Sequence, residues 1–200
     1  MDTGFIKLVG TEIRYSFLRN RDNHWMQVIY TIIPEKSEHI AEQIQTIENA
    51  EKEFYNIFKI GNETASAKRF FSSDLISHNS EIENYKKRQN TDFFMSVVEQ
   101  PPASGVKLSL LGMCLNNITS KLRHDNIICF DTTSGIRHIY AEHLIDSEAD
   151  EHSDSEKQTE RIFACLQEKL LEFDATIENS VLRTWIYAPH VDADYPGIVK

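Results

Sequence analysis

The sequence contains little cysteine, and its three cysteines form neither a CxxC pair nor an even set that could build a disulfide framework. All three, Cys114, Cys129 and Cys165, lie in apolar stretches, where buried and reduced thiols are the expected state. Reduced thiols of this kind are typical of a reducing compartment, so we expect a cytoplasmic protein.

Glycine is also scarce, and its placement excludes several catalytic and cofactor-binding loops. The seven glycines form no GxGxxG dinucleotide loop, no GxxxxGK[ST] phosphate loop and no GxSxG nucleophile elbow. The eight histidines are scattered without an HExxH pattern, and a strand would place His138 and His143 on opposite faces. We therefore predict no metal site and no bound cofactor.

Long hydrophobic runs and an excess of positive charge are missing as well. No stretch approaches the ~18 apolar residues of a membrane-spanning helix, and the first residues lack the basic and apolar parts of a signal peptide. The formal net charge of −10 argues against nucleic acid, because such binding depends on Lys and Arg neutralising phosphates. We expect neither a membrane nor a nucleic-acid partner.

The first 118 residues contain the alternating patterns of an α+β unit. Residues 25–33 are rich in β-branched and aromatic side chains and predict a strand, and residues 4–17 predict one or two more. Apolar residues then recur at helical spacing from Ser37 to Phe58. The other predicted elements are a strand at 67–72, a helix at 81–89, and strands at 93–100 and 106–115 around a Pro-Pro turn. This order predicts a mixed sheet with both helices on one face.

The rest of the chain predicts a second, shorter set of elements. Residues 116–125 form a polar connector, and residues 127–130 and 136–145 predict a hairpin. The acidic stretch 146–156 predicts a solvated segment before a helix at 157–173. A strand at 181–187, which Pro189 ends, and a helix that starts near 192, with Pro196 near its first turn, complete the set.

The two sets repeat one another at a spacing of 115 residues. This shift places Gln43 on Gln158, Ile47 on Ile162, Tyr55 on Leu170, Phe58 on Phe173 and Phe70 on Trp185. We therefore expect a first unit at residues 1–118 and the first half of a second unit at residues 119–200. On this division the second copy stops at Lys200, at the start of its second helix.

Several of these segments resemble the YjgF/RidA superfamily. They are the helix 158–173, the strand 181–187, the helix start at Tyr195-Pro196, and the strand pair 95–99 and 106–115 around Pro101-Pro102. Two such units in tandem, with an Arg-Thr-Trp strand in the second, resemble the chorismatases, the chorismate hydrolases built from two RidA-like halves. The resemblance implies α+β, RidA-like (chorismate mutase-like) units, and single-domain relatives assemble as trimers with clefts between subunits.

The resemblance also implies an arginine on the penultimate strand that binds the substrate carboxylate, since a guanidinium fork meets a carboxylate bidentately. In the first unit that position is Met95, whose thioether cannot make this contact. Glu99 keeps the family's acidic residue on the same strand, and in the second unit the corresponding strand lies beyond Lys200. The first unit is therefore expected to be a degenerate copy without its own catalytic residues.

Four side chains are candidates for substrate binding: Glu99, Tyr140, Arg183 and Tyr187. Glu99 could orient a substrate or a water molecule, or it could simply be a glutamate at a sheet edge. Arg183 could meet a dicarboxylate while Tyr187 lines its pocket, or Arg183 could be solvated at the end of a strand. Tyr140 lies on the strand before the acidic stretch.

Two functional hypotheses follow from the resemblance. The first is a chorismatase-like hydrolase or lyase of a small carboxylated metabolite, with the chain as given expected to be inactive. The second is a non-catalytic RidA-like module for packing, oligomerisation or small-ligand binding, and Met95 favours it for the first unit. The older family labels, translation inhibitor and endoribonuclease, fit poorly with the acidic composition. A homotrimer is the assembly that the resemblance implies.

Overall fold

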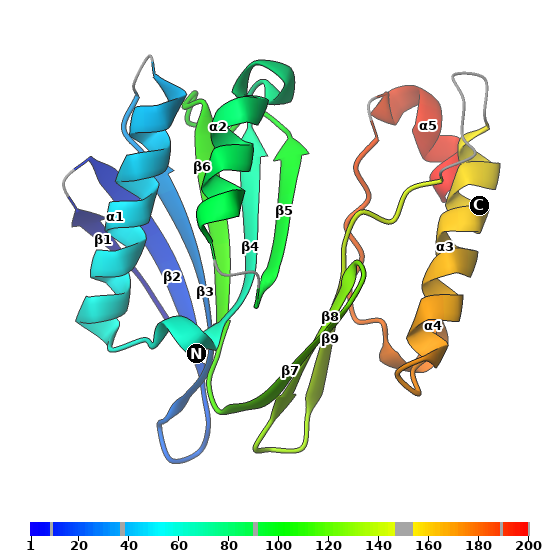
Figure 1. Ribbon diagram of the computed structural model, residues 1–200, viewed down its shortest axis with the longest axis horizontal. Coiled ribbons are helices and arrows are strands. Elements are labelled where there is room, and N and C mark those ends of the chain that lie inside the picture. Colours follow the sequence, from blue (N-terminus) through cyan, green and yellow to red (C-terminus); the bar gives the residue numbers. More distant parts are fainter. Residues whose placement is uncertain (9, 37–38, 90–91, 147–153, 189, 200) are drawn as a thin grey trace. The chain divides into compact units, whose positions relative to one another are not determined.

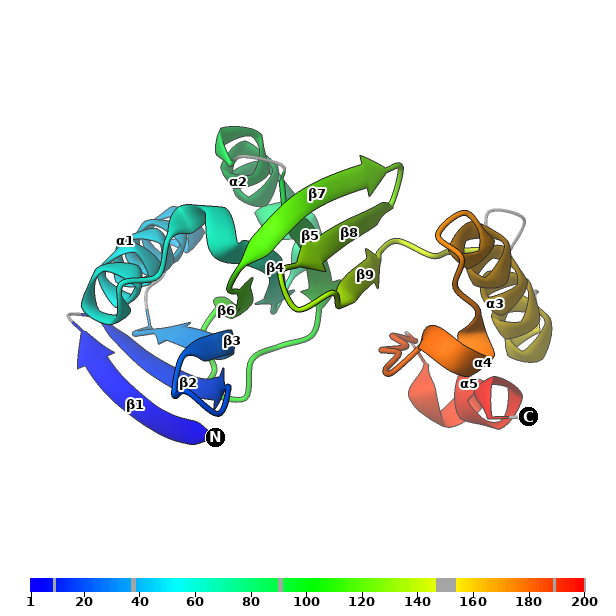
Figure 2. The ribbon, with the colours of Figure 1, turned by 90° about the horizontal axis from the view of Figure 1, so that it is seen from below.

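A computed structural model describes residues 1–199 of the chain except 9, 37–38, 90–91, 147–153 and 189. The chain divides into two compact units, Met1–Glu142 and His143–Lys200, which are described separately below (Figures 1 and 2). The repeat boundary predicted at residue 118 falls inside the first of these compact units. Among the described residues, no helix is both long enough and apolar enough to cross a membrane.

The first unit is built on a six-stranded mixed sheet. Its strands are β1 (Asp2–Leu8), β2 (Thr11–Arg19), β3 (Trp25–Pro34), β4 (Ala65–Ser72), β5 (Phe94–Glu99) and β6 (Leu108–Leu115). They lie in the order β1-β2-β3-β6-β4-β5 (Figure 1). Only β4 and β5 are parallel to each other, while the other neighbours are antiparallel. The mixed sheet predicted from the sequence is confirmed.

Helix α1 (Ile40–Phe58) covers one face of this sheet. Its buried residues, among them Ile44, Ile47 and Phe54, recur every three or four positions and therefore form one stripe along the helix. This stripe packs against the inward-facing residues of β3, where Val28 and Tyr30 are buried. A left-handed residue, Lys59, ends the helix, and the short 3₁₀ helix η1 (Asn62–Thr64) follows.

Helix α2 (Leu75–Arg88) lies on the same sheet face as α1 (Figures 1 and 2). It starts six residues before the predicted position, because the Asp74 carboxylate accepts a hydrogen bond from the Ser77 amide and caps the helix there. Ile82 and Tyr85 join the buried cluster that α1 and the sheet form. The prediction that both helices lie on one face is therefore confirmed.

A second, three-stranded sheet completes the first unit: β7 (Ile118–His124), β8 (Ile127–Thr132) and β9 (Arg137–Ala141). The predicted hairpin at 127–145 is confirmed, but the prediction of a polar connector at 116–125 is wrong. Most of the β7 side chains are exposed and polar, so the segment gives little apolar signal, yet its backbone pairs with β8 along its length.

The second sheet packs on the face of the large sheet opposite the helices. Cys114 belongs to the cluster under the helices, whereas its neighbour Leu115 belongs to a separate cluster with Phe94, Ile128 and Phe130. Successive side chains of a strand point to opposite faces, so this second cluster lies on the opposite face. The β8 strand therefore covers the part of the sheet where β5 starts and β6 ends.

The second compact unit is helical in its described residues. It contains α3 (Ser155–Leu171), α4 (Ile177–Ser180) and α5 (Val191–Ile198), and α3 and α5 pack on each other. The helix predicted at 157–173 and the helix start predicted near 192 are confirmed, although Pro196 lies in the middle of α5. Most of the predicted acidic stretch, 147–153, falls outside the described residues.

The strand predicted at 181–187 is wrong. Residues 181–188 run between α4 and α5 without regular secondary structure. The residue types favour a strand, but a strand exists only where a neighbouring strand completes its hydrogen-bond ladder. The described part of this unit contains no strand that could serve as that neighbour.

Candidate functional site

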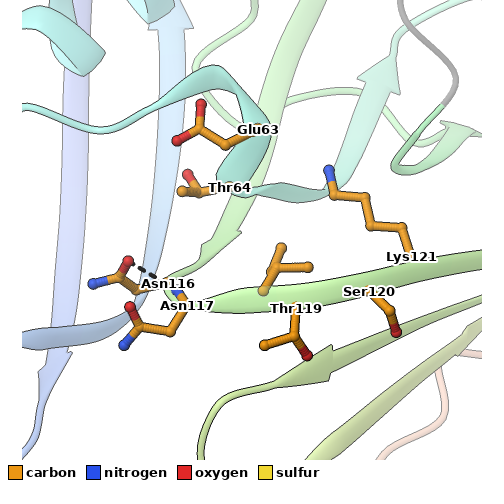
Figure 3. Close-up of a pocket in the computed structure, with 8 residues that line it drawn as sticks. Glu63, Thr64, Asn116, Asn117, Thr119, Ser120 and Lys121 are labelled. Atoms are coloured by element: carbon orange, nitrogen blue, oxygen red, sulfur yellow. Dashed lines mark hydrogen bonds between the residues drawn. The ribbon is translucent and has the colours of Figure 1, made fainter.

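A polar surface pocket of about 420 Å³ lies in the first unit, between the 3₁₀ helix η1 and the start of β7 (Figure 3). One wall comes from the turn that follows α1, and the other comes from the turn between β6 and β7 and from β7 itself. The lining residues are Glu63, Thr64, Asn116, Asn117, Ile118, Thr119, Ser120 and Lys121. All but Ile118 carry a polar or charged side chain.

Hydrogen bonds fix the turn that forms the second wall. Asn117 has a left-handed backbone (φ 60°), a conformation that asparagine tolerates better than most residues. The Asn116 side chain accepts a hydrogen bond from the Asn117 amide at 2.8 Å and donates one to the Trp25 carbonyl at 2.9 Å. The Thr133 amide donates to the Asn117 carbonyl at 3.0 Å. The backbone of this wall is therefore held in place before any ligand arrives.

Opposite charges come from the two walls of the pocket. Lys121 projects from β7 toward the start of β4, where its Nζ lies 3.4 Å from the Ala65 carbonyl oxygen (Figure 3). Burial lowers the pKa of Lys121, while the carboxylates of Asp92 and Glu63 act to raise it. Glu63 lies on the opposite wall, and its carboxylate folds over Gly61. A partly desolvated ammonium is stabilised by any anion that enters the pocket.

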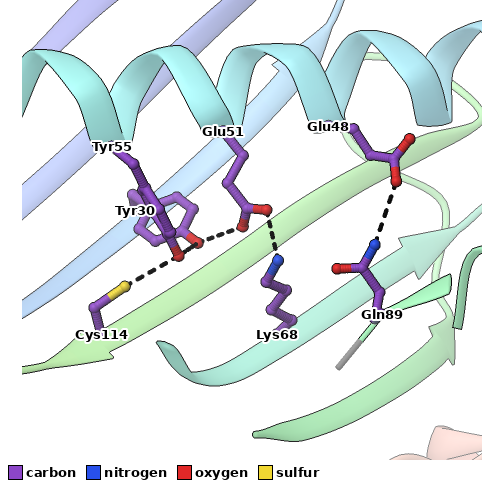
Figure 4. Close-up of polar contacts among 7 residues, drawn as sticks. All are labelled: Tyr30, Glu48, Glu51, Tyr55, Lys68, Gln89 and Cys114. Atoms are coloured by element: carbon purple, nitrogen blue, oxygen red, sulfur yellow. Dashed lines mark hydrogen bonds and ion pairs between the residues drawn. The ribbon is translucent and has the colours of Figure 1, made fainter. Parts of the chain in front are cut away.

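A buried polar network lies in the core of the first unit, between α1 and the sheet (Figure 4). Glu51 lies on the apolar stripe of α1, where it needs polar partners because it is only 7% exposed. Lys68 of β4, 4% exposed, donates to Glu51 Oε2 at 2.5 Å, and the Tyr30 hydroxyl donates to Glu51 Oε1 at 2.5 Å. The Lys68 ammonium also lies 5.0 Å from the centre of the Phe93 ring. These contacts offset the cost of burying the charges of Glu51 and Lys68.

The network continues from Tyr30 through Tyr55 to Cys114. The two hydroxyl oxygens are 2.8 Å apart, and Tyr55 Oη lies 3.1 Å from Cys114 Sγ. Burial raises the pKa of Cys114 to about 11, while hydrogen bonds with Tyr55 and Thr64 partly oppose the rise. The thiol is therefore neutral near pH 7 and is a weak nucleophile. This network positions core elements and offers no reactive group to a substrate.

The ring of Tyr30 reaches this network because β6 carries a glycine beneath it. A Cβ atom on Gly112 would lie 2.1 Å from Tyr30 Cζ, which is inside van der Waals contact. Gly112 and Tyr30 are directly paired across β6 and β3. The glycine therefore serves the close approach of an aromatic ring, which is a common reason for glycine inside a strand.

The predicted site residues that lie in the first compact unit do not come together. Glu99 is exposed at the last position of β5. Tyr140 packs at the other end, where its ring centre lies 5.7 Å from that of Phe94 and its hydroxyl donates to Met113 Sδ at 3.0 Å. Glu99 lies five strand positions after Phe94, a distance of about 16 Å. Met95 packs against the core beneath the helices.

Arg183 and Tyr187 lie in the second unit, on the segment without regular structure. The Arg183 guanidinium lies 5.5 Å from the centre of the Trp185 ring, and both Arg183 and Tyr187 are exposed. Among the described residues, no group of three or more His, Cys, Asp and Glu side chains could hold a metal ion.

The pocket residues escaped the sequence prediction because their segment was interpreted as a connector. The available signal was Asn116-Asn117 directly after the apolar strand ending at Leu115, because asparagine pairs favour tight turns with left-handed backbone. The approach of η1 to this turn depends on the tertiary fold and has no sequence signal of its own.

No protein-family model matches the chain, and no curated protein matches it. Several solved structures resemble part of it, and two of them are described here. One is a candidate translation initiation inhibitor from Salmonella typhimurium with 10% identity and a TM-score of 0.40, over 56% of this chain and 96% of that one. The other is the yeast protein YEO7_yeast with 14% identity and a TM-score of 0.33, over 56% and 83% of the two chains. Scores this low do not establish a common fold.

Proposed function

We propose that the chain is a RidA-like module that binds a small carboxylated metabolite bearing an amino group, without turning it over. The observation that carries the proposal is the presence of the Lys121 ammonium and the Glu63 carboxylate on opposite walls of one polar pocket. A zwitterionic ligand places its carboxylate at Lys121 and its amino group at Glu63. The side-chain amide of Asn117 offers a neutral partner for a further polar group.

Size and pre-organisation support this proposal. A pocket of about 420 Å³ falls within the range of small-molecule sites, roughly 300–1,000 Å³. The hydrogen bonds that hold the wall at Asn116 and Asn117 reduce the ordering that binding would otherwise require. A pocket lined almost entirely by polar groups favours a polar metabolite over an apolar one.

The binding proposal predicts a specific effect of Lys121→Met. Titration of the ¹⁵N-labelled protein with L-glutamine should shift the amide resonances of Asn117 and Lys121. Loss of the ammonium should weaken this binding at least ~10-fold, about 1.4 kcal/mol, because a charge-assisted contact is removed. Lys52→Met, on the exposed side of α1, is the matched control and should bind like the parent protein.

Two derivatives of L-glutamine separate the roles of the two charges. The N-acetyl form loses the amino charge that Glu63 would bind, and the methyl ester loses the carboxylate that Lys121 would bind. Both should bind more weakly than L-glutamine itself. Equal affinity for all three compounds, or no shift at the pocket with any of them, would rule out the proposed site.

A chorismatase-like hydrolase remains the second candidate function, because Arg183 offers an exposed guanidinium near the aromatic residues Trp185 and Tyr187. A tandem arrangement would support it, and the spacing of the helices agrees with one. Helix α3 begins at Ser155, 115 residues after α1 begins at Ile40, and α4 begins at Ile177, 115 residues after η1 begins at Asn62. These spacings match the shift found in the sequence.

We nevertheless expect little or no hydrolysis of chorismate or of 2-imino acids by residues 1–200. Orienting a carboxylated substrate requires a preorganised cationic group, and removing such a group typically costs several kcal/mol of transition-state stabilisation. Met95 occupies the position that the resemblance assigns to an arginine. The check is a turnover assay with chorismate and with an imine generated in situ, run beside Arg183→Ala. Robust turnover that Arg183→Ala abolishes would contradict the expectation.

A further inference from the structure

The segment Val181–Ala188, called here the linking segment, exposes its apolar side chains to an unusual degree. Leu182 is fully exposed, and Ile186, Trp185 and Tyr187 are exposed over about half of their surfaces. Large apolar residues scattered singly on a surface are ordinary, but a consecutive run of them marks an interaction site. Three of the exposed apolar residues here, Trp185, Ile186 and Tyr187, are consecutive, and Leu182 lies three positions before Trp185.

The linking segment also has the composition of a strand. Val181, Thr184 and Ile186 are β-branched, and Trp185 and Tyr187 are aromatic, so most of its residues belong to the types enriched in sheets. Residues 181–188 belong to no helix and to no sheet ladder among the described residues. A strand-prone segment of this kind is suited to pairing with another strand edge to edge.

We propose that the linking segment pairs with the same segment of a second copy, as an antiparallel two-stranded ribbon with Trp185 opposite Trp185 of the second copy. A two-fold axis through this pair makes the interface self-complementary and closed. Arg183 then lies opposite Tyr187 of the second copy, and Thr184 lies opposite Ile186. The Trp185–Trp185 and Thr184–Ile186 pairs combine residue types that stabilise sheets.

The charge of the segment allows a second copy as the occupant, and the contact of each Arg183 with a tyrosine ring across the ribbon favours it. Arg183 is the only charged residue between Val181 and Ala188. In this register the two Arg183 residues are four strand positions apart, about 14 Å, which exceeds the Debye length of ~8 Å at physiological ionic strength. Repulsion between the two copies is therefore weak, and each guanidinium lies across from a tyrosine ring.

The ladder in this register uses the backbone of Leu182, Thr184, Ile186 and Ala188. Opposed residues in an antiparallel pair alternate between hydrogen-bonded and non-hydrogen-bonded positions. Placing Trp185 at a non-hydrogen-bonded position brings its Cα within about 4.5 Å of its counterpart and leaves these four residues to exchange hydrogen bonds. A separation this short also lies within the range that a disulfide can bridge.

Cysteine cross-linking of the full chain tests the register. Trp185→Cys, in a Cys165→Ser background, should form a disulfide-linked dimer of twice the 23.2 kDa monomer mass under mild oxidation. Leu182→Cys is the matched control, because it is fully exposed but would lie about 20 Å from its counterpart in this register. Equal cross-linking of both variants, or none with Trp185→Cys, would overturn the proposal.

Hydrogen exchange of the unaltered chain provides a test that does not depend on substituting a tryptophan. Amide protection at Thr184 and Ile186 should rise at least ~10-fold as protein concentration increases through the dimerisation range. Light scattering on the same samples should show the mass doubling in parallel. Protection that is absent, or that does not change with concentration in a strictly monomeric sample, would overturn the proposal.

Discussion

Replacing Lys68 by methionine is expected to lower the free energy of unfolding by about 3–5 kcal/mol. The substitution leaves the Glu51 carboxylate buried without the ammonium that lies 2.5 Å away, and an uncompensated buried charge is strongly destabilising. Tyr30 still donates to Glu51, but a single neutral hydroxyl replaces only part of the lost interaction. Urea denaturation followed by circular dichroism measures the change.

Two further variants separate the charge effect from other causes. Lys86→Met removes a lysine whose ion pair with Glu83 is near the surface, so it should cost less than about 1 kcal/mol. Glu51→Leu combined with Lys68→Met removes both charges and should recover a large part of the stability lost in Lys68→Met. If Lys68→Met and Lys86→Met proved equally mild, the importance assigned to the buried pair would be wrong.

Phe54→Ala should destabilise the first unit by a similar amount, about 3–5 kcal/mol. The Phe54 ring is fully buried and packs on Tyr15, Tyr30, Tyr55 and Phe58, with ring centres 4.9–6.3 Å apart. Truncation removes these contacts and leaves a cavity that the surrounding sheet and helix cannot fully close. The midpoint of urea unfolding should fall accordingly, with little change in the slope of the transition.

Ile57→Ala is the control for Phe54→Ala, since it lies on the same helix and is 51% exposed. It removes apolar atoms that are already half exposed to solvent and should change the free energy of unfolding by no more than about 0.5 kcal/mol. A loss at Ile57 comparable to that at Phe54 would show that α1 does not bury the face described here.

Sequence periodicity predicted the elements that carry their own apolar pattern. The buried residues of strand β3 alternate, and those of helix α1 recur every three or four positions. The predicted ranges of both elements therefore lie close to their observed bounds. Strand β7 was missed because it is mostly polar and is held by pairing with β8. The segment 181–187 was predicted as a strand because its residue types favour one, although the described part of its unit supplies no neighbouring strand.

The candidate site was less predictable than the fold for a related reason. In the sequence, Glu51 is one of many polar residues of α1, and Lys68 is a single cation of β4. They become partners only because the helix packs on the sheet. Likewise, Glu63 and Lys121 are far apart in the chain and meet only where η1 approaches β7. Spacing along one element reveals residues on a shared face, but it does not reveal contacts between elements.

The central place of β6 has a consequence for synthesis of the chain. Strand β6 lies between β3 and β4, so the large sheet stays in two parts until Leu115 has been added. The end of β3, Pro34, leaves the ribosome's catalytic centre 81 residues earlier. At about 5–20 residues per second, this interval lasts roughly 4–16 s. During that time β3 has an open edge, so the nascent chain is most prone to mispairing before its middle strand arrives.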